Sequence, residues 1–137
     1  SPYSRLAGLK ILIVEDNEIN LEIETELLRD QGFLVDTAEN GSIAIEKMKN
    51  ARPEDYSLIL MDIQMPVMNG LKAAKAIRAL EDPELANIPI IALSANAFES
   101  DKRASLESGM NVHLTKPIDI PLLLETMSKL IHTKNNI

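Results

Sequence analysis

One acidic residue stands where chemistry could occur, directly after a long apolar run. Asp62 follows Leu58–Met61, and the chain then turns through Met65-Pro66 and Asn69-Gly70. An apolar run of this length fits a strand covered on both faces, as in parallel sheets, where functional groups collect at the carboxyl ends of the strands. A lone aspartate more often caps a strand or starts a turn. Residues elsewhere in the sequence are needed to distinguish these two interpretations.

Three other apolar runs of the sequence also end in reactive side chains. If the strands are parallel, their carboxyl ends share one edge of the sheet, and these side chains meet Asp62 there. The sequence thus predicts a cluster of three carboxylates, one hydroxyl and one ammonium. The runs and their residues are Lys10–Val14 before Glu15 and Asp16, Pro89–Leu93 before Ser94, and Asn111–Thr115 before Lys116.

Three carboxylates at one edge repel one another, by about 4 kcal/mol for each close pair in a partly screened site. The ammonium of Lys116 and a divalent cation together would balance their charge. A few hard oxygen ligands with room for water favour Mg²⁺. This set resembles a phosphoryl-transfer site, in which Asp62 would be the nucleophile. The metal, Ser94 and Lys116 would each stabilise a phosphoryl oxygen.

The elements that must position these residues follow from hydrophobic periodicity. The chain has 137 residues, which fits one domain with one substantial core. Five strands alternate with five helices, which predicts an α/β fold with a parallel sheet covered on both faces. We place a linker or terminal tail at 1–8, the domain at 9–132 and a frayed end at 133–137. The expected strands are 10–14, 33–37, 58–61, 89–93 and 111–115, and the expected helices are 18–31, 42–49, 71–80, 99–108 and 120–131.

The first helix carries apolar residues at i, i+4 and i+8. Ile19, Ile23 and Leu27, with Leu28 beside them, are expected to face the core. Glu81–Asn87 is predicted to be the longest surface loop. The helix 99–108 is rich in charge and is predicted to be the least tightly packed. The side chains of the first helix expected to face solvent are Glu22, Glu24, Glu26 and Arg29.

Composition excludes several classes of function. The formal net charge is -7, and the sequence lacks the Lys and Arg clusters through which proteins bind nucleic acids. The absence of cysteine removes disulfides, thiolate metal sites and Cys nucleophiles. No apolar run approaches the roughly 18 residues of a membrane span and no signal peptide opens the chain, so we expect no membrane contact by this segment. A cytoplasmic location is compatible with this, including the cytoplasmic part of a membrane-anchored sensor kinase.

Four segments, in order and at the right spacing, carry a resemblance to a known family. They are ILIVEDN (11–17), LILMDIQMPVMNG (58–70), PIIALSA (89–95) and LTKP (114–117). Over Leu9 to about Ile131 the chain resembles the receiver domain of bacterial two-component response regulators. The resemblance implies a flavodoxin-like, doubly wound sheet of five strands in the order 2-1-3-4-5. It also implies a signalling domain that assists its own phosphotransfer and dephosphorylation, rather than an enzyme.

The resemblance also implies a role for each clustered residue. Asp62 would be the phosphoacceptor, Lys116 the phosphoryl-binding lysine and Ser94 the switch hydroxyl. The ligands of Mg²⁺, direct or through water, would be Glu15, Asp16, Asp62 and the backbone carbonyl of Gln64.

One position departs from the family pattern. Three residues before Lys116, where the family usually has Tyr or Phe as the switch residue, this chain has His113. His113 would either take over that role, with added pH sensitivity, or face solvent on an edge strand. In this family the bond between Lys116 and Pro117 is often cis.

The partners implied by the resemblance are phosphohistidine donors, either a histidine kinase or a histidine phosphotransfer domain. Docking would use the first helix near Asn20 and the loop at Pro117 and Ile118, and the domain would be a monomer or a weak dimer. Phosphorylation would shift the helix 99–108. RLAGLKILIVEDNEIN (5–20) and MDIQMPVMNG (61–70) resemble receivers attached to hybrid sensor histidine kinases. A free-standing regulator is the alternative parent.

Two other functions stay open from the residues alone. A Mg²⁺-dependent phosphatase of the haloacid dehalogenase type would also use an aspartyl nucleophile, but it needs a second Asp two residues later, where this chain has Gln64. A phosphorylation-independent interaction module is the other alternative, and the complete set of chemical side chains counts against it.

Overall fold

The computed structural model describes residues 3–65 and 68–131, which form a five-stranded sheet. The strand order is β2-β1-β3-β4-β5, and all neighbouring pairs are parallel. This confirms the predicted parallel α/β fold and the order 2-1-3-4-5. The strands are β1 (Lys10–Val14), β2 (Leu34–Ala38), β3 (Leu58–Asp62), β4 (Ile90–Ser94) and β5 (Val112–Thr115).

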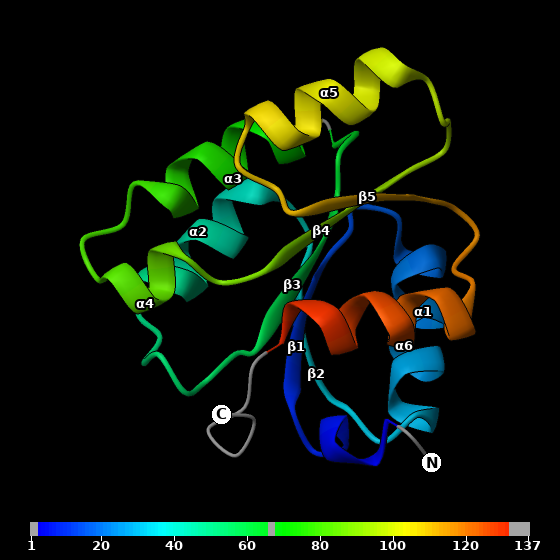
Figure 1. Cartoon of the computed structure of the whole chain (residues 1–137). Coiled ribbons are helices and arrows are strands. Elements are labelled where there is room, and N and C mark those ends of the chain that lie inside the picture. Colours follow the sequence, from blue (N-terminus) through cyan, green and yellow to red (C-terminus); the bar gives the residue numbers. More distant parts are fainter. Residues whose placement is uncertain (1–2, 66–67, 132–137) are drawn as a thin grey trace.

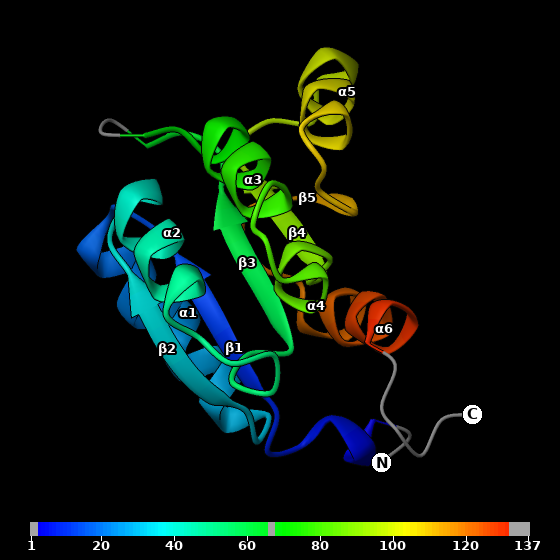
Figure 2. The same ribbon diagram turned by 90° about the vertical axis from the view of Figure 1, so that its left-hand side faces the viewer.

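Helices cover both faces of this sheet (Figure 1). α1 (Glu18–Asp30) and α6 (Ile120–Leu130) lie on one face. α2 (Gly41–Lys49), α3 (Gly70–Arg78) and the short α4 (Pro83–Ala86) lie on the other, which Figure 2 turns toward the viewer. α5 (Glu99–Glu107) packs beside the edge strand β5. Among the described helices, none is both long and apolar enough to cross a membrane.

The three central strands read as continuous apolar runs because each face of the sheet has its own core. Side chains of β1, β3 and β4 alternate between the two cores, so every second residue meets α2 and α3 and the others meet α1 and α6. The first core includes Leu12, Val14, Ile59, Met61, Ala44, Ala73, Ala74 and Ile77, and the second includes Ile11, Ile13, Leu58, Leu60, Leu28, Leu123 and Met127.

Two segments are more ordered than their sequence pattern predicts. Residues 81–87 contain the helical turn α4, in which Asp82 caps the first turn and Leu85 is buried, so this stretch is not simply a surface loop. Residues 4–6 of the expected tail form a 3₁₀ turn that buries Leu6. Arg5 donates to the backbone carbonyls of Ser128 and Ile131 near the end of α6. Short apolar segments are packed here by tertiary contacts that periodicity does not report.

The orientation of α1 differs from the prediction. Ile19 and Ile23 are 69% and 51% exposed, whereas Glu24 is buried, so the expected apolar face is turned outward and an expected solvent-facing acid is turned inward. Leu28 faces the core as expected, but its partner there is Leu21, with Glu24 and Thr25 between them. These four residues also recur at i, i+3, i+4 and i+7. The sequence held two overlapping helical stripes, and the less apolar one is buried.

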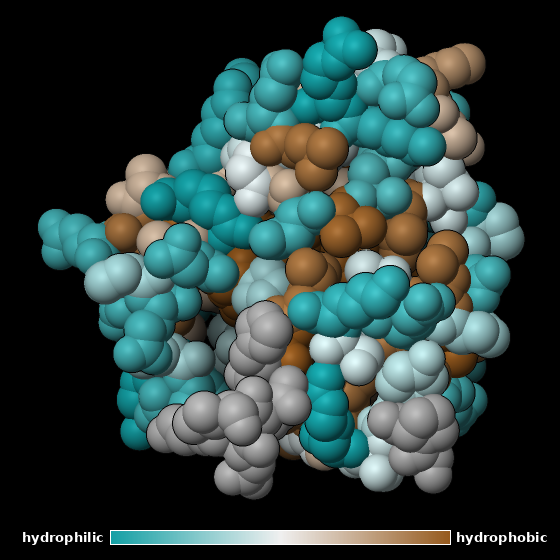
Figure 3. Space-filling view, in the orientation of Figure 1, coloured by the Kyte–Doolittle hydropathy of each residue, from teal (hydrophilic) through white to brown (hydrophobic). Residues whose placement is uncertain are grey.

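α5 is the least buried long helix, as its composition predicts, because Ser105 is its only fully buried residue. Phe98, at its amino end, and Leu106 are both more than half exposed. Apolar side chains gather on the face between α5 and α6, over β5 (Figure 3). A hollow between β5 and α6 on this side of the sheet is lined by Leu114, Ile118 and Leu122 among others.

Arg78 connects the end of α3 to three other segments. Its guanidinium donates to the backbone carbonyls of Gly109, Ala86 and Ile88 at 2.7–2.8 Å and to the side chain of Asn111 at 3.0 Å. The same Asn111 oxygen accepts from the backbone N–H of Ile90. Arg78 therefore holds Gly109, two residues after α5, together with the end of α4 and the segment before β4.

Gly70 lies against the backbone of the central strand. A Cβ added to Gly70 would lie 2.5 Å from the carbonyl oxygen of Asp62 and 2.9 Å from Cα of Ile63. The backbone N–H of Gly70 donates to the carbonyl of Ile63. Only glycine permits this close approach, which holds the start of α3 beside the end of β3.

We expect Gly70→Ala to lower the free energy of unfolding by about 1–3 kcal/mol, because the added methyl group meets backbone atoms that have little room to move. Urea unfolding followed by circular dichroism measures this difference. Lys75→Ala, at an exposed position of the same helix, is the matched control and should change stability by less than about 0.5 kcal/mol. An equally stable Gly70→Ala variant would contradict the close approach.

Candidate functional site

The carboxyl ends of β1, β3, β4 and β5 bring the predicted reactive side chains together at one edge of the sheet. The register places Asp62 beside Leu93 and Ser94 beside Thr115, so the chain positions that follow the strands are neighbours. Glu15, Asp62 and Ser94 are 1%, 4% and 2% exposed. Asp16 is exposed and leaves one side of the cluster open to water.

Lys116 pairs unequally with the two buried carboxyl groups. Its Nζ lies 2.7 Å from Oε1 of Glu15 and 3.6 Å from Oδ1 of Asp62. Glu15 also accepts from the backbone N–H of Asn17 at 3.2 Å, whereas Asp62 accepts a longer bond of 3.3 Å from the backbone N–H of Gln64. Glu15 is therefore better compensated than Asp62. The peptide bond between Lys116 and Pro117 is cis, as the resemblance implied.

This inequality appears in the pKa values of the two acids. Burial raises the pKa of Asp62 to about 7, and the adjacent Glu15 adds to the rise while Lys116 opposes it. Burial acts on Glu15 as well, but hydrogen bonds from Lys116, from Asp62 and from the backbone of Asn17 hold the pKa of Glu15 below its ordinary value. The site thus has too little positive charge for the acids it contains.

The acidic residues fit a divalent cation. One oxygen from each of Glu15, Asp16 and Asp62 can be chosen so that all lie within 4.8 Å of one another. The donors are all hard carboxylate oxygens. The pKa of Asp62 is raised first by burial and then by Glu15, so added positive charge would stabilise its ionised form. Gln64 is exposed next to the cluster, and the role of its backbone carbonyl stays a prediction. Pro66, in the expected turn after Asp62, lies outside the described residues.

Ser94 is hydrogen-bonded to His113 at the end of β4. Its Oγ lies 2.8 Å from Nε2 of His113 and donates to the backbone carbonyl of Asn96 at 2.7 Å. His113 is half-buried, so the alternative of a solvent-facing histidine is wrong. The direct contact joins β5 to the residue expected to act as the switch hydroxyl.

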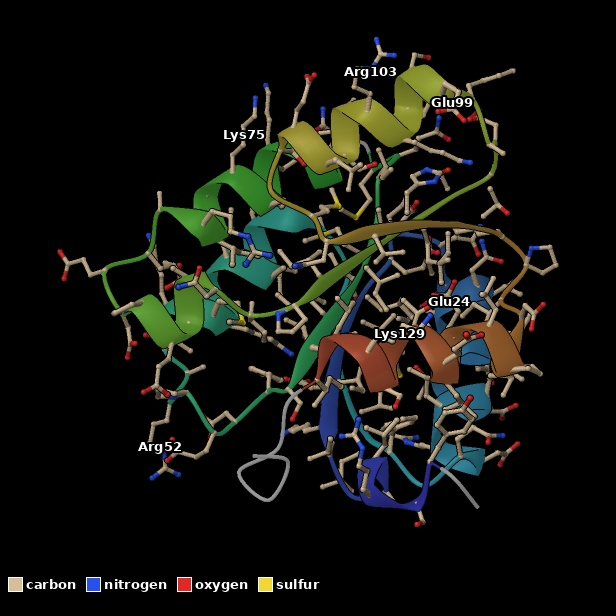
Figure 4. The ribbon with its side chains drawn as sticks, in the orientation of Figure 1. Glu24, Arg52, Lys75, Glu99, Arg103 and Lys129 are labelled. Carbon is tan, nitrogen blue, oxygen red and sulfur yellow. The ribbon has the colours of Figure 1, made fainter. Side chains whose placement is uncertain are left out.

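Glu24 is the residue of this region that sequence reasoning missed. It is 5% exposed on the inner side of α1 (Figure 4), and its Oε1 has no hydrogen-bond partner in the part of the chain that the structure describes. Burial, followed by repulsion from Glu15, raises its pKa to about 8. A fourth carboxyl group therefore lies behind the cluster. The available signal was the spacing of Leu21 and Leu28, which places Glu24 on the same face of the helix.

The predicted docking residues line one groove. Asn20, Pro117 and Ile118 border a groove of about 430 Å³ together with the outward stripe of α1 at Ile23 and Leu27. Lys116 and Glu24 also line it. Asn17 caps α1 by accepting from the backbone N–H of Asn20. The exposed apolar face of α1 and the loop after β5 thus form one surface beside the acidic cluster.

Comparisons with known proteins agree with this geometry. The model of the response regulator receiver domain family matches residues 11–128. A hybrid signal transduction histidine kinase M of Dictyostelium discoideum is 41% identical over 126 residues, which are 91% of this chain and 5% of that kinase. The chain thus spans about a twentieth of that relative's length.

Two solved structures are similar over most of the chain. The receiver domain of a sensor histidine kinase from Pseudomonas aeruginosa, with a magnesium ion coordinated in its active site cleft, has a TM-score of 0.81 and 37% identity, and the match covers 93% of this chain and 100% of that one. The receiver domain of the response regulator Ssk1 of Saccharomyces cerevisiae, in complex with the histidine phosphotransfer protein Ypd1, has a TM-score of 0.77 and 33% identity, with 90% and 89% covered.

Glu24 should make stability depend on pH. Its pKa is about 8 in the folded protein against an ordinary 4.5, so the unfolded chain ionises first and stability falls as the pH rises from about 4.5 to about 8. We expect Glu24→Gln to raise the free energy of unfolding by about 2 kcal/mol at pH 8 and by much less at pH 5. Urea unfolding at both pH values tests this, with the exposed Glu22→Gln as control. A gain that is equal at both pH values would count against a buried acid.

Proposed function

Because the chain belongs to the response regulator receiver domain family, we propose that it acts in a two-component phosphorelay by accepting a phosphoryl group on Asp62. The observation that carries the proposal is the cluster formed by the carboxyl groups of Asp62, Glu15 and Asp16. One oxygen from each lies within 4.8 Å of the others, and the ammonium of Lys116 lies beside them. Such a site stabilises negative charge on an incoming phosphoryl group once a divalent cation is bound.

In the proposed reaction a carboxylate oxygen of Asp62 attacks phosphorus, and the bond between phosphorus and the donor's imidazole nitrogen breaks. The electron pair of that bond leaves with the imidazole, and an acyl phosphate remains on Asp62. Lys116 is 3.6 Å from Asp62 and reaches the oxygens of a phosphoryl group there with a small movement of its flexible side chain. The hydroxyl of Ser94 donates to another of these oxygens.

Mg²⁺ would be held by Glu15, Asp16, Asp62 and the backbone carbonyl of Gln64, and it would supply the positive charge that the site lacks. This assignment is supported by the fit of the acidic cluster and by the magnesium ion in the similar receiver from Pseudomonas aeruginosa. Phosphorylation would be read out through Ser94 and His113, which connect the site to β5 and the weakly packed α5.

We infer that the partner is a phosphohistidine protein that docks on the groove between α1 and the loop at Pro117 and Ile118. The exposed Ile23 of α1, with Leu27 and Ile118, gives this surface the apolar character expected of a docking site. The similar receiver of Ssk1, solved in complex with Ypd1, supports a histidine phosphotransfer domain as one such partner. The parent chain would be a hybrid histidine kinase, as in the relative from Dictyostelium discoideum.

The phosphatase alternative is disfavoured by the residue two positions after the nucleophile. Such an enzyme needs an acid two residues after Asp62, and Gln64 cannot transfer a proton there. An interaction module without phosphorylation is disfavoured because Asp62, Lys116 and Ser94 are gathered at the same edge with the two acids of β1.

We expect Asp62→Asn to abolish incorporation of one phosphoryl group from acetyl phosphate in the presence of Mg²⁺, because the amide is not a nucleophile. Intact-protein mass spectrometry measures the added mass. Glu18→Gln, at the exposed start of α1, is the control and should be labelled as the parent is. Equal labelling of Asp62→Asn would refute the phosphoacceptor assignment.

We expect Ile118→Asp to slow phosphoryl transfer from a phosphohistidine protein by about tenfold, because a charge in the apolar groove weakens docking. Labelling by acetyl phosphate, which needs no docking, should be unchanged. Leu106→Asp, at an exposed apolar position of α5, is the matched control and should transfer normally. If both variants slow transfer equally, docking does not depend on this groove.

A further inference from the structure

The hydroxyl of Ser94 has two close neighbours, and they constrain where its proton lies. Its Oγ is 2.7 Å from the backbone carbonyl oxygen of Asn96 and 2.8 Å from Nε2 of His113. Ser94 is 2% exposed, so water does not compete for these contacts. The backbone carbonyl can only accept a hydrogen bond, and a hydroxyl has one proton to give. That proton is therefore committed to Asn96.

The contact with His113 must then run in the opposite direction. Since Ser94 has no second proton, Nε2 of His113 carries a hydrogen and donates it to Oγ. The other ring nitrogen, Nδ1, is buried and has no hydrogen-bond partner among the described residues. A hydrogen on Nδ1 would be an unpaired buried donor, which is costly. The hydrogen bond to Oγ and the lack of a partner for Nδ1 both indicate the neutral tautomer with its hydrogen on Nε2.

The surroundings of the ring keep it neutral. Burial lowers the pKa of His113, and Lys102 of α5 lowers it further, against smaller opposite effects of Asp101 on the same helix and of the backbone of His113 itself. The strand on the other side, β4, presents the uncharged Ser94 and is followed by Asn96. The chain from His113 through Ser94 to Asn96 is thus a relay of two neutral hydrogen bonds, in which each bond polarises the next.

We propose that His113 is a positioning residue that holds Ser94 in a resting arrangement, in which its hydroxyl proton is withheld from the phosphoryl group on Asp62. This inference rests on the proposed function and names a regulatory part of the same site. To donate to a phosphoryl oxygen, Ser94 must first give up the Asn96 carbonyl. A phenylalanine at position 113 would fill similar space but has no N–H with which to hold Oγ.

The tautomer can be tested without phosphorylation. Nitrogen NMR of the ¹⁵N-labelled, unphosphorylated protein at pH 8 separates the protonated and unprotonated ring nitrogens of its two histidines, and His113→Gln identifies the signals of His113 by their loss. We expect the hydrogen of His113 on Nε2. A hydrogen on Nδ1, or rapid exchange between the two tautomers, would overturn the proposal.

The effect on the site can be tested with beryllofluoride, which mimics a phosphoryl group on a carboxylate, titrated in the presence of Mg²⁺. Losing the His113 hydrogen bond removes support for the resting arrangement, so His113→Phe should bind beryllofluoride roughly three- to tenfold more tightly than the parent. His113→Gln keeps an amide N–H near the position of Nε2 and should bind as the parent does.

A double-mutant comparison separates this hydrogen bond from simple packing. In the Ser94→Ala background, His113→Phe should change beryllofluoride affinity by less than about twofold, because the bonded hydroxyl is absent. A His113→Phe variant that folds normally and binds no more tightly would overturn the proposal, as would an equal gain in the Ser94→Ala background. If the parent protein itself bound no beryllofluoride, the proposed function would fail, while the tautomer measurement would still decide how His113 holds Ser94.

Discussion

The charge balance of the site is governed by repulsion between the carboxyl groups that the parallel sheet brings together at one edge. Each close pair costs about 4 kcal/mol in a partly screened site, and one ammonium cannot offset all of them. Lys116 compensates Glu15 first, since it lies 2.7 Å from that acid and 3.6 Å from Asp62. The remaining deficit falls on Asp62, whose pKa rises to about 7. The fold tolerates this deficit because β1, β3 and β4 supply a core that is buried on both faces. The same deficit favours the binding of a divalent cation there.

Much of this arrangement could be predicted from the sequence, because two simple patterns determine it. Apolar runs of four or five residues with charged or hydroxyl ends identify buried strands, and parallel strands bring such ends to one edge. Asp62, Glu15, Ser94 and Lys116 were found in this way, and their proximity is now observed. The order of the strands came only from the resemblance, since periodicity within a strand carries no information about its neighbours.

The predictions for α1 that were wrong have a common physical cause. In α1 the most apolar stripe is turned outward, since Ile19 and Ile23 are exposed and Ile23 borders the groove beside Ile118. Periodicity assumes that apolar residues face inward, and in α1 this assumption fails. Glu24 was misplaced for the same reason. The hydrogen bond between Ser94 and His113 could not be predicted either, because it depends on side-chain rotamers that two adjacent strands determine together.

Arg78 has a consequence for how α5 can move. Its guanidinium holds the carbonyl of Gly109, just after α5, and also holds the segments at Ala86 and Ile88. The amino end of α5 begins at the exposed Phe98 and has no side-chain cap. The end of α5 near Gly109 is therefore held by more hydrogen bonds from outside the helix than its first turn is, so the two ends of the helix differ in how firmly the rest of the fold restrains them.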